Sequence, residues 1–199
     1  MTSYRRLLEP HVPSTALAPL ERYVELLEAW SRRHNLVRYR DPRDLVDRHL
    51  LDALAGAGLM EGARSLLDVG SGAGLPAIPL LCVRPDLQAT LLEPRHKRWA
   101  FLKLVIRELG LNASVMAARY DNLGPSDGPW DRITARALGG HDDLLRAVRP
   151  RLTATGAVVL WVTTDEVERL AATPGWRVVG FALPRSDRGR LAYLQPCST

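Results

Sequence analysis

The 199-residue sequence has only two cysteines, Cys82 and Cys197, with no Cys-x-x-Cys or mixed Cys/His grouping. This scarcity excludes a disulfide framework and gives no sign of a zinc site, so we expect no metal. Long apolar runs are also missing. No stretch approaches the roughly 18 uncharged residues that a membrane span needs, and no leader-like apolar block lies near the start. We therefore expect a soluble cytoplasmic protein without membrane contact and, from its length, one domain over residues 1–199.

Lysine is scarce as well, because 25 of the 27 basic residues are arginine, and the formal net charge is +5. The guanidinium group is a planar fork that matches phosphate, and a basic surface tolerates polyanions. An excess of Arg and Ala also follows from a GC-rich genome. The charge alone therefore leaves nucleic-acid binding and genome composition both open.

Hydrophobic periodicity divides the chain into two parts. Apolar residues recur at helical spacing over 16–33, and Asp41 and Pro42 suit the N-cap and first position of a second helix. We expect these helices to form an N-terminal cap over residues 1–62. Over residues 63–199, short apolar runs alternate with helical segments, which indicates an α/β fold with a mostly parallel seven-stranded sheet and helices on both faces. The expected strands are 64–69, 88–93, 113–117, 131–135, 155–162, 176–182 and 190–195, and the expected helices between them are 76–83, 95–109, 140–149 and 164–172.

The segment DVGSGAG, residues 68–74, follows the first expected strand of the sheet. Its glycines permit unusual backbone angles and a close approach of a ligand to the main chain, and ligands bind at this point of an open α/β sheet. A dinucleotide would favour G-x-G-x-x-G, whereas here an acid, Asp68, precedes alternating glycines. An acid suits a cationic ligand better than a diphosphate. The alternative is a tight strand-to-helix turn that binds nothing.

Glu93 ends the second expected strand, where a carboxylate can accept both hydroxyl groups of a ribose. A nucleoside with a positive group fits this pair of acids, and S-adenosylmethionine is such a ligand. The combination resembles the first two motifs of the Rossmann-like class I methyltransferases. A nicotinamide enzyme is the main alternative, and the glycine spacing counts against it.

Motifs that the sequence lacks exclude some of the possible methyl acceptors. Methylation of an exocyclic amine uses an Asn/Asp-Pro-Pro-aromatic loop after the fourth strand, whereas DRITARA leads here into 137–140. Methylation at C5 of cytosine needs a thiolate, and Cys197 lies in a tail that we expect to fray. An atom with a free lone pair, such as guanine N7, remains as an acceptor. It has no proton to lose, so positioning suffices and no general base is needed.

Four successive segments carry a more specific resemblance: NLVRYRDPRDLVDRHLLDAL, LLDVGSGAGLPAIPL, KRWAFLKLV and DRITARAL. Together they resemble the small-subunit ribosomal RNA methyltransferase G family, also called glucose-inhibited division protein B, over roughly residues 20–160. Members transfer the S-adenosylmethionine methyl group to guanine N7 in the decoding region of 16S rRNA. The resemblance implies that activity, 16S rRNA or the 30S subunit as partner, and an antiparallel last strand. We also expect a monomer.

Matched residue by residue, the resemblance puts Gly70 and Leu75 against the cofactor, Tyr120 and Asp121 beside its adenine, and Arg136 at the active-site mouth. A turn-starting role is the alternative for Asp121. The predicted cofactor contacts are Asp68, Gly70, Ser71, Gly72, Gly74, Leu75, Glu93, Tyr120, Asp121 and Arg136, and the predicted catalytic residues are Arg119, Arg136 and Arg190.

Arg136 closes a short apolar strand, and an unpaired guanidinium is costly to bury. It therefore either reaches a carboxylate in the core, with Asp68 and Asp131 as candidates, or faces the substrate. The resemblance favours the substrate. His49 lies on the apolar face of its helix, where we expect a hydrogen-bonded core histidine and no catalytic part.

The sequence departs from the family pattern at three places: Ala77 replaces a glycine, Val162 or Thr163 stands where a lysine is usual, and Leu191 replaces a histidine. Loss of two cationic groups leaves open a diverged methyltransferase that acts on another RNA or a small molecule, or a non-catalytic rRNA-binding assembly factor.

Basic residues cluster at 32–43, 95–98 and 185–190. If these clusters share one face, they would bind an RNA backbone, with Tyr39 or Trp99 available for stacking. If they are scattered, they are solvated helix ends.

Overall fold

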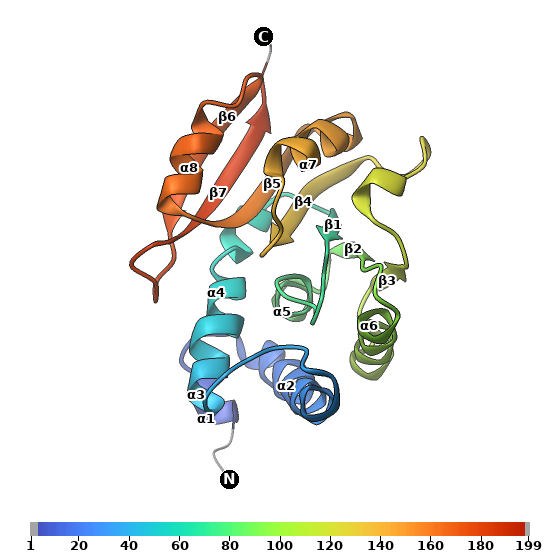
Figure 1. The fold of residues 1–199 in the computed structure, drawn as a ribbon. Coiled ribbons are helices and arrows are strands. Elements are labelled where there is room, and N and C mark those ends of the chain that lie inside the picture. Colours follow the sequence, from blue (N-terminus) through green and yellow to red (C-terminus); the bar gives the residue numbers. More distant parts are fainter. Residues whose placement is uncertain (1–3, 198–199) are drawn as a thin grey trace.

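The computed structural model describes residues 4–197 and contains a seven-stranded sheet in the order β3-β2-β1-β4-β5-β7-β6. The strands are β1 (Ser65–Val69), β2 (Gln88–Leu92), β3 (Ala113–Met116), β4 (Trp130–Arg136), β5 (Leu152–Thr163), β6 (Trp176–Ala182) and β7 (Gly189–Pro196). Strands β1 to β5 pair in parallel, and β7 runs antiparallel to both β5 and β6 (Figure 1). The α/β fold, the seven strands and the antiparallel last strand are therefore confirmed.

Helices cover both faces of the sheet (Figure 1). The α-helices are α1 (Tyr4–Leu8), α2 (Ser14–His34), α3 (Pro42–Leu45), α4 (Leu51–Leu54), α5 (Ala77–Val83), α6 (His96–Leu109), α7 (His141–Val148) and α8 (Thr164–Ala171). The shorter turns are the π-helix η1 (Val46–Leu50) and the 3-10 helices η2 (Ala57–Met60), η3 (Tyr120–Asn122) and η4 (Arg149–Arg151). Helices α2, α5 and α6 lie on one face, and α7 and α8 lie on the other.

Alternation along the strands fills a core on each face of the sheet. In β1, Leu66 packs with α2, α5 and α6, whereas Leu67 packs with α7 and α8. In β5, Val159 and Val158 divide in the same way, as the period of two in a strand requires. The N-terminal helices contribute to the first of these cores, so they form one layer together with α5 and α6.

Helix α2 also fixes the loop that follows β1. Tyr23 is fully buried, and its hydroxyl group donates a 2.8 Å hydrogen bond to the carbonyl oxygen of Ala73. Burial raises the pKa of Tyr23 far above its usual value, so the phenol stays neutral. A side chain of the N-terminal layer is thus hydrogen-bonded to the backbone of the glycine loop.

The second expected helix begins as predicted but is not uniform. Asp41 caps it, because its carboxylate accepts a hydrogen bond from the backbone N–H of Asp44, and Pro42 takes the first position. The helix then widens into the π-helix η1 before it returns to α4. Hydrophobic spacing does not distinguish one π turn from an α-helix, so neither this widening nor the short α1 was expected. Among the described residues, no helix has the length and apolar character needed to cross a bilayer.

Candidate functional site

The carboxyl ends of the parallel strands bring most of the predicted site residues to one edge of the sheet. The glycine loop follows β1, Glu93 follows β2, η3 follows β3, and Arg136 ends β4. Neighbouring strands in this region are β3-β2-β1-β4, so the segments lie in that order along the edge. This is the edge at which open α/β sheets bind ligands.

The glycine loop is bare at two of its three glycines. Gly70 and Gly72 have φ angles of 70° and 58°, which favour glycine. A Cβ placed on Gly70 would lie 3.7 Å from the Leu138 side chain, and one on Gly72 would lie 3.6 Å from Arg98 Nη1. Both distances are ordinary van der Waals contacts, so nothing closer covers the backbone at these two glycines. We call the surface over Gly70 and Gly72 the cradle. Gly74 differs, because a Cβ there would collide with the Ile78 side chain.

Glu93 and Ser71 hold the loop in shape. The Glu93 carboxylate, only 2% exposed, accepts the backbone N–H of Gly72 at 2.9 Å and that of Arg95 at 2.8 Å. Ser71 donates its backbone N–H to the Leu92 carbonyl oxygen at 2.9 Å. Each carboxylate oxygen has a second lone pair. Glu93 can therefore shape the loop and still accept hydroxyl groups from a ligand.

Asp68 has an unusual environment. It is fully buried, and its Oδ1 accepts a 2.7 Å hydrogen bond from the Thr134 hydroxyl group, whereas Oδ2 has no partner among residues 4–197. Burial raises the pKa of Asp68 to about 6. An unsatisfied buried oxygen directly before a bare loop fits a ligand that brings a cationic or donor group. The cradle, Glu93 and Asp68 together fit a nucleoside with a positive group.

Arg136 is tied to the N-terminal layer. Its guanidinium donates to the carbonyl oxygens of His49 at 3.0 Å and Arg48 at 2.9 Å, and it lies 3.6 Å from the Asp52 carboxylate. The two carbonyl groups belong to the π-helix η1. Burial lowers the pKa of Arg136, and Asp52 opposes that shift. The guanidinium therefore joins the end of β4 to η1.

Neither of the two acids considered as core partners for Arg136 pairs with it. Asp68 is bonded to Thr134, and Asp131 lies at the start of β4, where its carboxylate accepts the backbone N–H groups of Arg64 and Ser65. Asp131 thus lies at the amino ends of β1 and β4, which are the ends away from the glycine loop. Asp52 was overlooked because it lies in the N-terminal layer and no local pattern links it to β4.

His49 is hydrogen-bonded as expected, but it is not the core histidine that the sequence predicted, because it is not one of the residues buried in either core of the sheet. Its Nε2 lies 3.1 Å from the carbonyl oxygen of Arg38, and the residue is half-buried. Burial and the charge of Arg136 lower the pKa of His49. The imidazole therefore stays neutral at pH 7 and packs as part of the layer that holds Arg136.

The other predicted residues have partners of their own. Arg119 pairs with Asp121 at 3.2 Å, both side chains being largely exposed, and its guanidinium lies 6.0 Å from the centre of the Tyr120 ring. Arg190 donates to the carbonyl oxygens of two residues in its own hairpin. Leu75 packs, partly buried, against the core on the α5 face. Arg119, Arg136 and Arg190 thus each have separate partners, and their catalytic roles stay predictions.

The departures from the family pattern have structural roles. Thr163 is the N-cap of α8, where it forms a reciprocal capping box with Glu166. Val162 and Leu191 are buried in the two cores, and Ala77 is fully buried at the start of α5. These side chains therefore stabilise the fold.

Two further residues border the cradle and were not singled out from the sequence as contacts. Leu138 reaches it from the loop after β4, and Arg98 reaches it from α6. Arg98 was visible only as one member of a basic cluster. Tyr39, by contrast, packs on the core and donates its hydroxyl proton to Glu28, so it is not free to stack.

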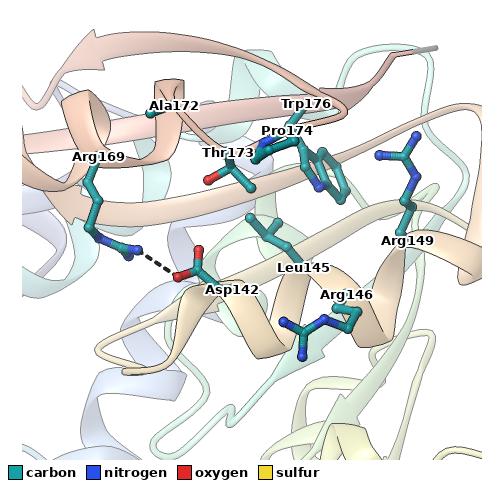
Figure 2. A pocket seen from close by; sticks show the side chains of 9 residues that line it. All are labelled: Asp142, Leu145, Arg146, Arg149, Arg169, Ala172, Thr173, Pro174 and Trp176. Carbon is teal, nitrogen blue, oxygen red and sulfur yellow. Dashed lines mark hydrogen bonds and ion pairs between the residues drawn. The ribbon is translucent and has the colours of Figure 1, made fainter. Parts of the chain in front are cut away.

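Other hollows lie elsewhere. A surface groove of about 670 Å³ lies between α7 and α8 and is lined by Arg146, Arg149 and Arg169 around Leu145 and Trp176 (Figure 2). Its lining residues come from neither the glycine loop nor Glu93, so it is separate from the cradle. Within the described part of the chain, no group of three or more His, Cys, Asp or Glu side chains could hold a metal ion.

Comparisons with known proteins agree with this geometry. A family model described as rRNA small subunit methyltransferase G matches residues 16–174. A protein of that name from Anaeromyxobacter dehalogenans is 39% identical over 90% of this chain and 87% of its own length. One from Chromobacterium violaceum is 37% identical over 83% of this chain and 79% of its own length.

Solved structures share the fold at low identity. A putative caffeoyl-CoA O-methyltransferase from Staphylococcus aureus superposes with a TM-score of 0.67 at 12% identity and covers 96% of both chains. An rRNA methylase from Streptococcus thermophilus gives a TM-score of 0.55 at 13% identity, over 81% of this chain and 100% of its own. Both similarities support a Rossmann-like methyltransferase fold.

Proposed function

This chain belongs to the rRNA small subunit methyltransferase G family, and from that premise we propose that it transfers a methyl group from S-adenosylmethionine to N7 of a guanine in 16S rRNA. The observation that carries the proposal is the bare cradle over Gly70 and Gly72, whose loop is hydrogen-bonded to the carboxylate of Glu93 and closely preceded by Asp68 with its unsatisfied Oδ2. A dinucleotide would bring a diphosphate to this pair of acids, which like-charge repulsion disfavours.

The residues of the cradle suit the separate parts of the cofactor. Glu93 has free lone pairs for the ribose hydroxyl groups, and Asp121 at the end of the β3 segment is exposed and can accept from the adenine amino group. Asp68 supplies negative charge close to the loop. When bound, the cofactor supplies a methyl group on a positively charged sulfur.

The reaction needs little acid–base catalysis from the protein. Guanine N7 carries a free lone pair and no proton, so the chain must orient the base, exclude competing geometries and keep the two reactants aligned. Leu138 flanks the cradle at the end of β4 and can pack against a base there. The resemblance assigns Arg119, Arg136 and Arg190 to this side, and we propose that they position the RNA.

The partner in this proposal is 16S rRNA or the 30S subunit, and the enzyme acts as a monomer. A ribosomal substrate would place it in the cytoplasm. The neutral residues Thr163 and Leu191 at the positions of a family lysine and histidine reduce the positive charge near the acceptor, but both have structural roles that explain their retention.

The test is transfer of a tritiated methyl group from S-adenosylmethionine to 30S subunits that lack the native modification, followed by mapping of the labelled base. We expect label at a guanine N7 in 16S rRNA. Label found on a small molecule or on another RNA would show that the acceptor is not 16S rRNA. Cofactor binding without any transfer to RNA would contradict the enzyme assignment and favour a binding protein.

A further inference from the structure

Three groups of basic side chains on the surface differ in how far nearby acids neutralise their charges. In the groove between α7 and α8, Arg169 pairs with Asp142 at 3.0 Å, as Figure 2 shows, and Arg146 pairs with Asp143 at 3.0 Å. Arg149 donates to two backbone carbonyl groups. The acids of α7 thus already balance much of the positive charge of this groove.

The second group lies on the helix that contains η1 and on the loop before β7. Arg40 and Arg48 lie 3.0 and 3.7 Å from the carboxylate of Asp44, which is buried. Arg185 pairs with Asp47 at 3.0 Å. Arg185 thus joins the loop to the helix, and the two aspartates of the helix balance much of the charge of the three arginines.

The third group makes no such ion pairs, and it is set apart by its contact with the cradle. It consists of Arg95, Lys97 and Arg98 at the start of α6, and none of their side chains makes an ion pair or a hydrogen bond with any residue in the range 4–197. Lack of partners alone does not distinguish this group, because exposed arginine side chains elsewhere in the described chain also make no ion pair or hydrogen bond, among them Arg32, Arg33, Arg38 and Arg43. The first turn of α6 contains no acid. Arg95 and Lys97 are exposed, and Arg98 is half-buried. Three like charges within four residues repel one another, and no ion pair with a residue of the described range 4–197 offsets that repulsion.

This third group borders the cradle. Arg98 Nη1 lies 3.6 Å from the position that a Cβ on Gly72 would take, so the guanidinium stands at the edge of the proposed cofactor site. The next residue, the half-buried Trp99, stacks on His96 with ring centres 5.8 Å apart, and Lys103 Nζ lies 4.7 Å from its ring centre. Cations and an aromatic ring thus run along α6 away from the cradle.

We propose that Arg95, Lys97 and Arg98 bind the backbone of the single-stranded RNA that flanks the methylated guanine, and that Trp99 beside them stacks on one of its bases. The inference rests on the proposed function, which brings the base over the cradle and therefore takes the strand across its edge. Unpaired cations beside an aromatic ring are the combination that binds single-stranded nucleic acid without reading its sequence. In the other two groups, every arginine except Arg149 would have to break an ion pair to bind a phosphate.

Two double variants test the inference. Arg95→Ala/Lys97→Ala removes two exposed, unpaired charges from α6, and the control Arg146→Ala/Arg169→Ala removes two charges from the groove in Figure 2. The Kd for protein-free 16S rRNA is measured over a series of KCl concentrations. For the α6 variant we expect a Kd raised about tenfold and a salt slope smaller by about 1.4, which corresponds to two contacts on single-stranded RNA. The control keeps the wild-type Kd and slope.

An unchanged Kd and slope in the α6 variant would overturn the inference, and a loss confined to the control would move RNA binding to the groove. Thermal unfolding and S-adenosylmethionine affinity, which we expect to match the wild type, show that the α6 variant is folded. Failure of the proposed function is visible separately. A wild-type protein that binds RNA through α6 but methylates none of it would refute the activity and leave RNA binding by α6 standing.

Discussion

The two halves of the ligand-binding edge of the sheet differ in how well their polar groups are satisfied. Around β1, β2 and α6, Asp68 Oδ2 and the charges of Arg95 and Lys97 have no partner in the described chain, and the cradle is bare. At the end of β4, the guanidinium of Arg136 has three partners. Unsatisfied groups that folding does not need indicate where ligands bind, whereas satisfied groups stabilise the fold.

The largest effect is expected from a substitution in the half of the edge around β1, β2 and α6, where several polar groups lack partners in the described chain. Gly72→Asp places a side chain and a negative charge in the cradle, and we expect S-adenosylmethionine affinity to fall by about a hundredfold or more. Aspartate tolerates a positive φ better than most residues, so the fold should survive. Gly58→Asp is the matched control, because a Cβ at Gly58 meets nothing within 4 Å. Equal affinity in the two variants would refute the cradle as the cofactor site.

The next largest effect is expected at the end of β4, where the polar groups have partners. Arg136→Ala leaves the half-buried Asp52 and two carbonyl groups of η1 without their partner, and we expect the free energy of unfolding to fall by about 2–4 kcal/mol. Urea unfolding measures this loss. If stability is unchanged while turnover disappears, Arg136 acts on the substrate alone and the comparison between the halves fails.

A smaller effect sharpens the account of Asp68. Its pKa rises from 3.8 to about 6 on folding, so the folded protein holds the proton more tightly and stability falls as pH rises from about 4 to 6. Asp68→Asn removes this cost, and we expect the ligand-free protein to gain about 1–3 kcal/mol at pH 7.

The same substitution should weaken S-adenosylmethionine binding, because it removes the negative charge that suits a cation. Wild-type affinity should likewise fall as pH drops below about 6. Calorimetric titration at several pH values checks both statements. An Asp68→Asn protein that binds the cofactor as well as the wild type would make Asp68 a purely structural residue.

The smallest effect concerns the missing family lysine. Thr163→Lys destroys the capping box of α8, so we expect a loss of about 1 kcal/mol in thermal or urea unfolding. Thr163→Ser keeps a capping hydroxyl group and should stay close to the wild type. A stable Thr163→Lys protein would mean that the cap does not explain why threonine stands there.

The sequence predicted the strands well because their alternation and length are local properties. The expected strand 176–182 coincides with β6, and the other strands differ by a few residues at their ends. The π-helix η1 escaped prediction because its apolar spacing resembles that of an α-helix. The pairing of Arg136 with Asp52 joins segments far apart in the chain, so no local pattern could reveal it.

The candidate site was predicted in part for the same reason. The glycine loop and Glu93 follow strand ends, which sequence locates, and the structure joins them through the hydrogen bond from Gly72 to Glu93. What sequence could not give is which charges remain unpaired. Arg98 and Arg185 look alike in two basic clusters, yet only Arg185 meets an aspartate.

The most direct test of the account is calorimetric titration of the wild-type protein with S-adenosylmethionine, compared with NAD under the same conditions. We predict that S-adenosylmethionine binds at one site per chain and that NAD gives no saturable heat. Tighter binding of NAD, or no binding of S-adenosylmethionine, would contradict the assignment of the cradle and with it the proposed reaction.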